Sequence, residues 1–88
     1  MEREELLKLI ESKEGIGVDL SGQKLEKIDF TGCRIERTSF KGCELVHCRF
    51  RNAKISWSDF RYAEIQHGTF EGAEIEFSDF YRAFIDGV

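Results

Sequence analysis

The chain has 88 residues and a formal net charge of −4, with 34% charged and 41% hydrophobic residues. This composition is typical of a small folded domain and excludes a disordered polyelectrolyte, and the negative charge argues against a general nucleic-acid binder. No apolar run is long enough to cross a membrane. The cysteines, Cys33, Cys43 and Cys48, lack C-x-x-C spacing, which argues against a zinc site or redox dithiol. Because the charged N-terminal segment has no signal-peptide core, we expect a cytoplasmic protein.

The first segment, residues 2–13, is predicted to form a helix. Acidic residues occupy its first turn, and Gly15 is placed to end it. Its apolar side chains share one side of the helix: Leu6, Leu7, Leu9 and Ile10. We expect residues 1–15 to cap the end of the fold that follows. The alternative is a mobile amphipathic arm that binds another protein.

From Leu20 onward, every fifth residue is large and apolar. These positions are Leu20, Leu25, Phe30, Ile35, Phe40, Leu45, Phe50, Ile55, Phe60, Ile65, Phe70, Ile75, Phe80 and Ile85. The residue two places before each of them is small from Cys33 onward. A five-residue period fits neither a straight helix nor a straight strand. The chain is therefore expected to turn a corner in every repeat, with one large and one small side chain directed inward.

The large residues also alternate with a period of ten, because phenylalanine occupies every second large position from Phe30 to Phe80. This alternation suits a coil with an even number of sides. The first small positions hold larger residues, namely Val18, Gln23 and Ile28. We therefore expect a looser first coil.

Several repeats share a small residue, then an acidic residue, then a large apolar one. The clearest are Ser58-Asp59-Phe60, Ala63-Glu64-Ile65, Ala73-Glu74-Ile75 and Ser78-Asp79-Phe80. This pattern resembles that of the pentapeptide repeat proteins, and the resemblance covers residues 18–87. It implies an all-β solenoid over residues 16–88, a right-handed four-sided parallel β-helix of about 3.5 coils. With the helical cap at residues 1–15, the chain would form a single domain.

Few side chains suggest catalysis or metal binding. His47 and His67 fall in one corner column, about 5 Å apart, and two histidines can begin a metal site; we favour two solvated side chains. The three cysteines fall on inward small positions, where cysteine acts as a small hydrophobe. A filled solenoid also has no cleft. We therefore expect no enzyme, no metal and no cofactor.

Aromatic side chains gather on outward positions of the last repeats. They are Trp57, Tyr62, Phe77, Tyr81 and Phe84, and Ile85 lies beside them at the end of the rod. Exposed aromatic clusters usually mark an interface, the alternative being that each ring only covers a corner. We predict that these six residues form an interface with a second copy, giving an end-to-end homodimer. Members of the family that the chain resembles dimerise in this way.

The charges are unevenly distributed along the chain. Residues 20–62 carry nine bases and five acids, net +4, whereas residues 63–88 carry one base and six acids, net −5. We expect a rigid, non-enzymatic module for protein interaction, with no direct contact to nucleic acid. The alternative, implied by the resemblance, is a DNA mimic that binds DNA gyrase and confers quinolone resistance. The short rod and its basic middle argue against mimicry. A third interpretation is that the chain is a piece of a larger protein.

Overall fold

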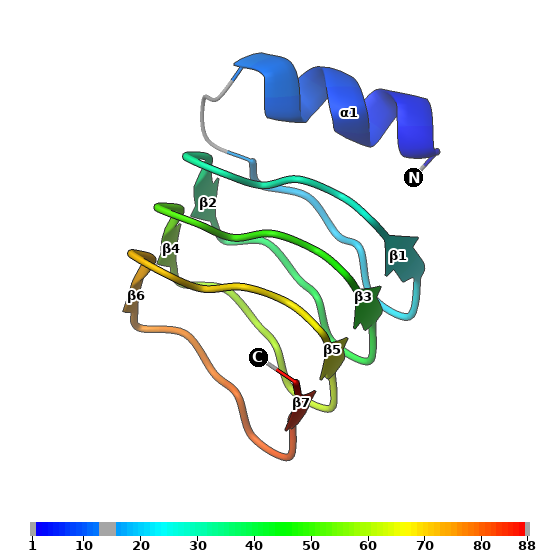
Figure 1. Cartoon of the computed structure of the whole chain (residues 1–88), viewed down its shortest axis with the longest axis vertical. Helices are drawn as coiled ribbons and strands as arrows, with labels where there is room; N and C mark the ends of the chain where they lie inside the picture. Colours follow the sequence, from blue (N-terminus) through cyan, green and yellow to red (C-terminus); the bar gives the residue numbers. More distant parts are fainter. Residues whose placement is uncertain (1, 13–15, 88) are drawn as a thin grey trace.

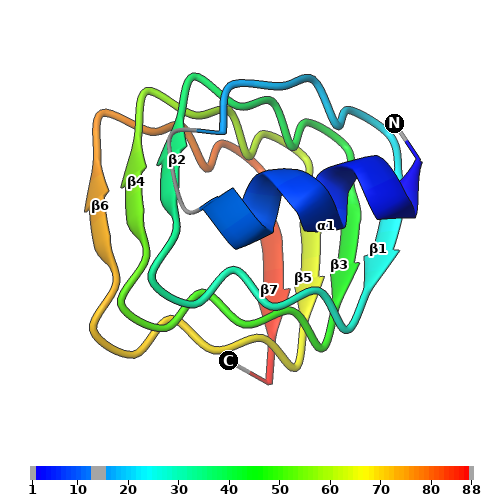
Figure 2. The same cartoon turned by 90° about the horizontal axis from the view of Figure 1, so that it is seen from above.

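The computed structural model describes residues 2–12 and 16–87 and shows one helix at the end of a parallel β-solenoid (Figure 1). Its strands form two parallel sheets, ordered β1-β3-β5-β7 and β2-β4-β6. Seen from above, the two sheets lie on opposite sides of the coil, and the helix lies across the end of the solenoid between them (Figure 2). The elements are α1 (Arg3–Ser12), β1 (Lys24–Glu26), β2 (Arg34–Glu36), β3 (Glu44–Val46), β4 (Lys54–Ser56), β5 (Glu64–Gln66), β6 (Glu74–Glu76) and β7 (Phe84–Asp86).

Neighbouring strands in each sheet are one coil apart in the sequence. Leu25 pairs with Leu45, which pairs in turn with Ile65, so that one coil contains four five-residue repeats. The other two sides of the coil are held by single bridges such as those from Asp29 to Arg49 and from Ser39 to Asp59. The predicted right-handed, four-sided parallel β-helix is therefore confirmed.

The chain turns each corner with a left-handed backbone residue, one in every repeat. Glycine adopts this conformation freely, as at Gly22 (φ 74°). Other corners hold larger residues, such as Trp57 (φ 52°) and His67 (φ 54°). A left-handed backbone costs a non-glycine residue about 1–2 kcal/mol. The stacked rungs therefore impose the corner geometry even where the local sequence opposes it.

The inward side chains stack into columns along the axis of the rod. The ring of Phe50 lies parallel to the rings of Phe30 and Phe70, and its centroid is 4.8 Å from that of Phe30 and 4.9 Å from that of Phe70. A second column has spacings of 4.6 Å and contains Phe40, Phe60 and Phe80. These spacings match the distance of about 4.8 Å between strands, and each stacked pair adds about 0.5–1.5 kcal/mol beyond burial. The alternation of phenylalanine in the sequence therefore corresponds to two stacked columns in the structure.

Helix α1 covers the first coil. Leu6 is fully buried in the core, and Leu9 and Ile10 pack against it. The Arg3 guanidinium donates a hydrogen bond of 2.8 Å to the backbone oxygen of Glu26 in β1. The helix therefore acts as a cap and not as a detached arm. Gly15, which the sequence places at the end of the helix, lies outside the described residues.

The first coil is one residue shorter than the others at a single corner. Ile16 pairs with Ile35, nineteen residues ahead, whereas Asp19 pairs with Ser39, twenty ahead. Gly17 occupies this corner, where a Cβ atom would lie 3.3 Å from the backbone oxygen of Glu36. The sequence predicted a looser first coil, but the structure instead shows a local shortening that a residue without a side chain accommodates.

Candidate functional site

The interior of the solenoid is open at the last coil. Ile65 is fully buried, but Ile85, which follows it in the same column, is 51% exposed. The neighbouring column changes in the same way, from 1% exposure at Ile55 to 41% at Ile75. Among residues 2–12 and 16–87, no further rung covers these side chains. The last coil therefore presents core-type side chains at the surface.

Two exposed aromatic residues stack at one corner near this end. Trp57 follows β4 and Phe77 follows β6, and both have the left-handed corner backbone. Their ring centroids lie 4.6 Å apart with a 12° angle between the planes. The two side chains are 59% and 69% exposed. Stacking therefore orders these rings without burying them.

A second aromatic pair lies beside the next corner of the same coils. The rings of Tyr62 and Tyr81 meet edge to face, with centroids 6.0 Å apart. The Arg82 guanidinium lies 5.4 Å from the Tyr81 ring centroid and donates a hydrogen bond to its hydroxyl. Phe84 projects from β7, opposite Glu64, and is 59% exposed. All six predicted interface residues are thus exposed on the last two coils, as two aromatic pairs and the two neighbouring β7 residues Phe84 and Ile85.

Ile75 also belongs to this site, although the five-residue period predicts an inward side chain there, because it lies in the last coil and is exposed. Phe70 and Phe80 are likewise only partly buried. The five-residue period could have indicated this exposure, because it shows which residues belong to the final coil. Inward residues of a final coil lack a covering rung on one side.

Acidic side chains surround the open end of the rod. They come from β6, β7 and the segments that flank them: Glu71, Glu74, Glu76, Asp79 and Asp86. Part of this charge is balanced by Arg61, which lies 2.8 Å from Asp59 and 4.0 Å from Asp79. The hydrogen bond from Arg61 lowers the pKa of Asp59. The candidate interface therefore has an apolar centre with a largely acidic rim.

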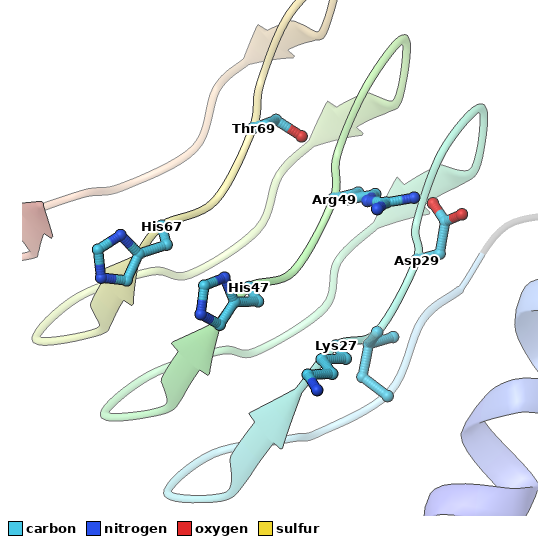
Figure 3. A pocket seen from close by; sticks show the side chains of 7 residues that line it. Lys27, Asp29, His47, Arg49, His67 and Thr69 are labelled. Carbon is cyan, nitrogen blue, oxygen red and sulfur yellow. The ribbon is translucent and has the colours of Figure 1, made fainter. Parts of the chain in front are cut away.

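The two histidines occupy one corner column, as predicted. Their rings stack with centroids 5.0 Å apart, and Lys27 and Arg49 border the same surface hollow (Figure 3). In the described part of the chain, no three or more His, Cys, Asp or Glu side chains gather in a metal-binding group. The neighbouring cationic side chains also oppose the binding of a metal cation at this corner.

The cysteines lie in the core, each on an inward small position. The Cys43 thiol donates to the backbone oxygen of Leu20, and the Cys48 thiol donates to that of Leu25 at 3.4 Å. Burial raises the pKa of Cys43 to about 11, and it also raises that of Cys48. Because the thiolate is the nucleophilic form, the raised pKa values of Cys43 and Cys48 disfavour nucleophilic chemistry at these two thiols at neutral pH.

These observations define a class of protein, a repeat scaffold whose coils stack around a filled core. The chain belongs to the pentapeptide repeat family, because a family model described as a pentapeptide repeat region matches residues 16–87. No helix of the described residues is long and apolar enough to span a bilayer.

Nine chains of solved structures match this protein. One is a pentapeptide repeat protein from the thylakoid lumen of Arabidopsis thaliana, with 22% sequence identity and a TM-score of 0.45. The match covers 81% of this chain and 61% of that one, so this chain spans about three fifths of its length. Comparison with curated proteins gives no match.

Proposed function

We propose that this protein is a non-enzymatic interaction module whose last coil binds a second copy end to end. The observation that carries the proposal is the exposure of Ile75 and Ile85, which lie in columns that are buried in the preceding coils. Burial of apolar surface contributes about 25 cal/mol per Å². A second copy of the same coil would cover these side chains with an equally apolar surface.

The geometry of the sheets supports a symmetric arrangement. β6 and β7 are the outermost strands of their sheets, so their outer edges have no strand neighbour among the described residues. A two-fold axis across the end of the rod would bring each edge against an edge of the second copy. The stacked core and the sheets would then continue from one chain into the other.

The DNA-mimic alternative requires acidic side chains along the whole rod. Here the acidic side chains gather on the last coil, whereas outward positions between β3 and β4 hold His47, Arg49 and Arg51. A mimic with this middle would repel a basic DNA-binding surface. The charge pattern therefore favours the interaction module. Inhibition of gyrase supercoiling by this protein, lost on mutating the acidic side chains, would favour mimicry instead.

The test is the molar mass in solution, measured by light scattering on the full chain. We expect about twice the chain mass of 10.2 kDa for the wild type. Phe84→Arg should give the monomer, because it places a charge beside the apolar centre of the interface. The matched control is Leu7→Arg, which alters a partly exposed apolar side chain of α1 at the other end of the rod.

Trp57→Arg, one coil back from the end, is expected to weaken the dimer less than Phe84→Arg does. A monomeric wild type at high protein concentration would contradict the proposal. So would a dimer that Leu7→Arg separates and Phe84→Arg leaves intact, because the interface would then lie at the helix end.

A further inference from the structure

The middle coil carries a row of basic side chains between β3 and β4. Four of the five exposed positions from the corner after β3 to the start of β4 are basic, namely His47, Arg49, Arg51 and Lys54; the fifth is the corner residue Asn52. All four side chains are exposed. The equivalent positions one coil later hold His67, Thr69, Glu71 and Glu74. The positive charge is therefore concentrated on one rung, which we call the basic row.

The basic row is poorly neutralised by the rest of the chain. Within residues 2–12 and 16–87, neither Arg49 nor Lys54 forms an ion pair. Arg51 lies 3.7 Å from Glu71, but both side chains are largely exposed. An exposed ion pair contributes only about 0–1 kcal/mol, so a ligand can replace it. The row therefore holds cationic groups that are available to an anionic partner.

The surface is hollowed around Arg49. One shallow depression of about 550 Å³ is lined by Lys27, His47, Arg49, His67 and Thr69, and by the carboxylate of Asp29 at its edge on the preceding coil (Figure 3). A second, of about 570 Å³, shares Arg49 and Thr69 and extends to Arg51. The two hollows follow the chain direction of the middle coil. Apart from Asp29, their polar side chains are mainly hydroxyl, amide and basic groups, and these lie along the middle coil and not in one enclosed pocket.

The spacing along the row matches that of an extended peptide. Arg49 and Arg51 are two residues apart on the outward side of an extended segment, which places their Cα atoms about 6.5–7 Å apart. Acidic residues two places apart in an extended peptide have the same spacing. An arginine guanidinium also binds a carboxylate through two parallel hydrogen bonds. We propose that the basic row binds an acidic segment of another protein, in an extended conformation with acidic residues at alternate positions.

The surrounding charges favour a short peptide over a nucleic acid. Asp29 lies one rung before Arg49 in the same column, and Glu71 lies one rung after Arg51. The chain as a whole has a net charge of −4. A long polyanion would be repelled by these groups, whereas a segment confined to the middle rung contacts mainly the basic row. This inference is independent of self-association, because the row lies on the side of the rod.

The test uses fluorescence anisotropy with a labelled peptide of about eight residues that alternates glutamate and serine, the length of the row. The comparison peptides replace glutamate with glutamine, or keep the composition but place the glutamates consecutively. At about 50 mM salt, we expect the alternating peptide to bind at least about threefold more tightly than the consecutive one and the glutamine peptide not to bind. An oligothymidine of equal charge should bind more weakly than the alternating peptide.

Two variants of equal charge change locate the site. Arg49→Glu should weaken binding at least about tenfold, and Lys54→Glu should weaken it less. The control is Lys41→Glu, an exposed lysine half a coil away, which should change affinity by less than about threefold. Equal losses for Arg49→Glu and Lys41→Glu, no binding of the alternating peptide, or tighter binding of oligothymidine would each overturn the proposal. The molar mass of Arg49→Glu should equal that of the wild type, which separates this site from the dimer interface.

Discussion

The two ends of the rod are built from the same repeat but differ in what covers them. At the first coil, α1 buries Leu6 to 1% exposure and seals the interior. The inward side chain of Leu25 in that coil is 6% exposed, whereas Ile85, at the other end of the same column, is 51% exposed. The comparison shows that a repeat in this fold does not bury its own core. Burial comes from the neighbouring layer, whether that layer is a rung, a helix or a second chain.

The largest expected effect compares the middle of the rod with its open end. Phe50 is stacked on both sides and fully buried, so Phe50→Ala should lower the free energy of unfolding by about 3–5 kcal/mol. Among the described residues, Phe80 stacks on a single ring, that of Phe60, and it is partly buried. Phe80→Ala should therefore cost about half as much in the monomeric Phe84→Arg background, measured by urea unfolding. Equal costs would show that the last coil is packed as well as the middle.

The next effect tests the cap. Leu6→Ala should lower the free energy of unfolding by about 2–5 kcal/mol, because it leaves a cavity between α1 and the first coil. Leu7→Ala, on the adjacent and partly exposed position, should cost less than about 1 kcal/mol. Thermal or urea unfolding of both variants measures the difference. If Leu6→Ala were as mild as Leu7→Ala, α1 would contribute little to sealing the rod.

Salt should have opposite effects on the affinity of the dimer and on the affinity of the basic row for an acidic peptide. Because the open end has an acidic rim, an end-to-end dimer brings like charges together, and screening reduces their repulsion. Raising the salt from about 50 to about 500 mM should tighten the dimer severalfold, as measured by sedimentation. Binding of the acidic peptide to the basic row should weaken over the same range. A dimer that loosens in high salt would contradict the proposed arrangement.

The smallest effect concerns the pH dependence of the core. Burial raises the pKa of Cys43 from 9.0 to about 11, so the folded protein retains a proton that the unfolded chain loses. The resulting stabilisation is complete below pH 9 and is lost as the pH rises to about 11. Cys43→Ala, which fits a position that holds Ala63 one coil later, should lose less stability over this interval than the wild type. Urea unfolding at both ends of the interval measures it, and identical pH profiles would refute it.

The fold was predictable because the five-residue period constrains every layer at once. The same five-residue spacing assigns every inward residue from Phe30 to Phe80. An irregular residue in one repeat therefore does not change the positions predicted for the others. The short corner at Gly17 was not predictable, because it depends on how the helix joins the first coil. The exposure of Ile75 was missed because an inward pattern does not reveal whether another layer follows. The basic row was also missed, because charges summed over long segments conceal one rung.

Because residues twenty places apart are paired, the length of an insertion determines whether the downstream side chains stay in their columns. Insertion of twenty residues within the rod would add one complete rung and leave every downstream side chain in its column. Insertion of five would rotate the downstream chain by one side, so that Phe and Ile columns would exchange neighbours and acidic residues would move to a different face. The nineteen-residue step from Ile16 to Ile35 occurs in the first coil, next to α1, where no preceding rung is present among the described residues. Changes in length by whole coils therefore preserve the columns, whereas changes by other lengths within the rod disrupt them.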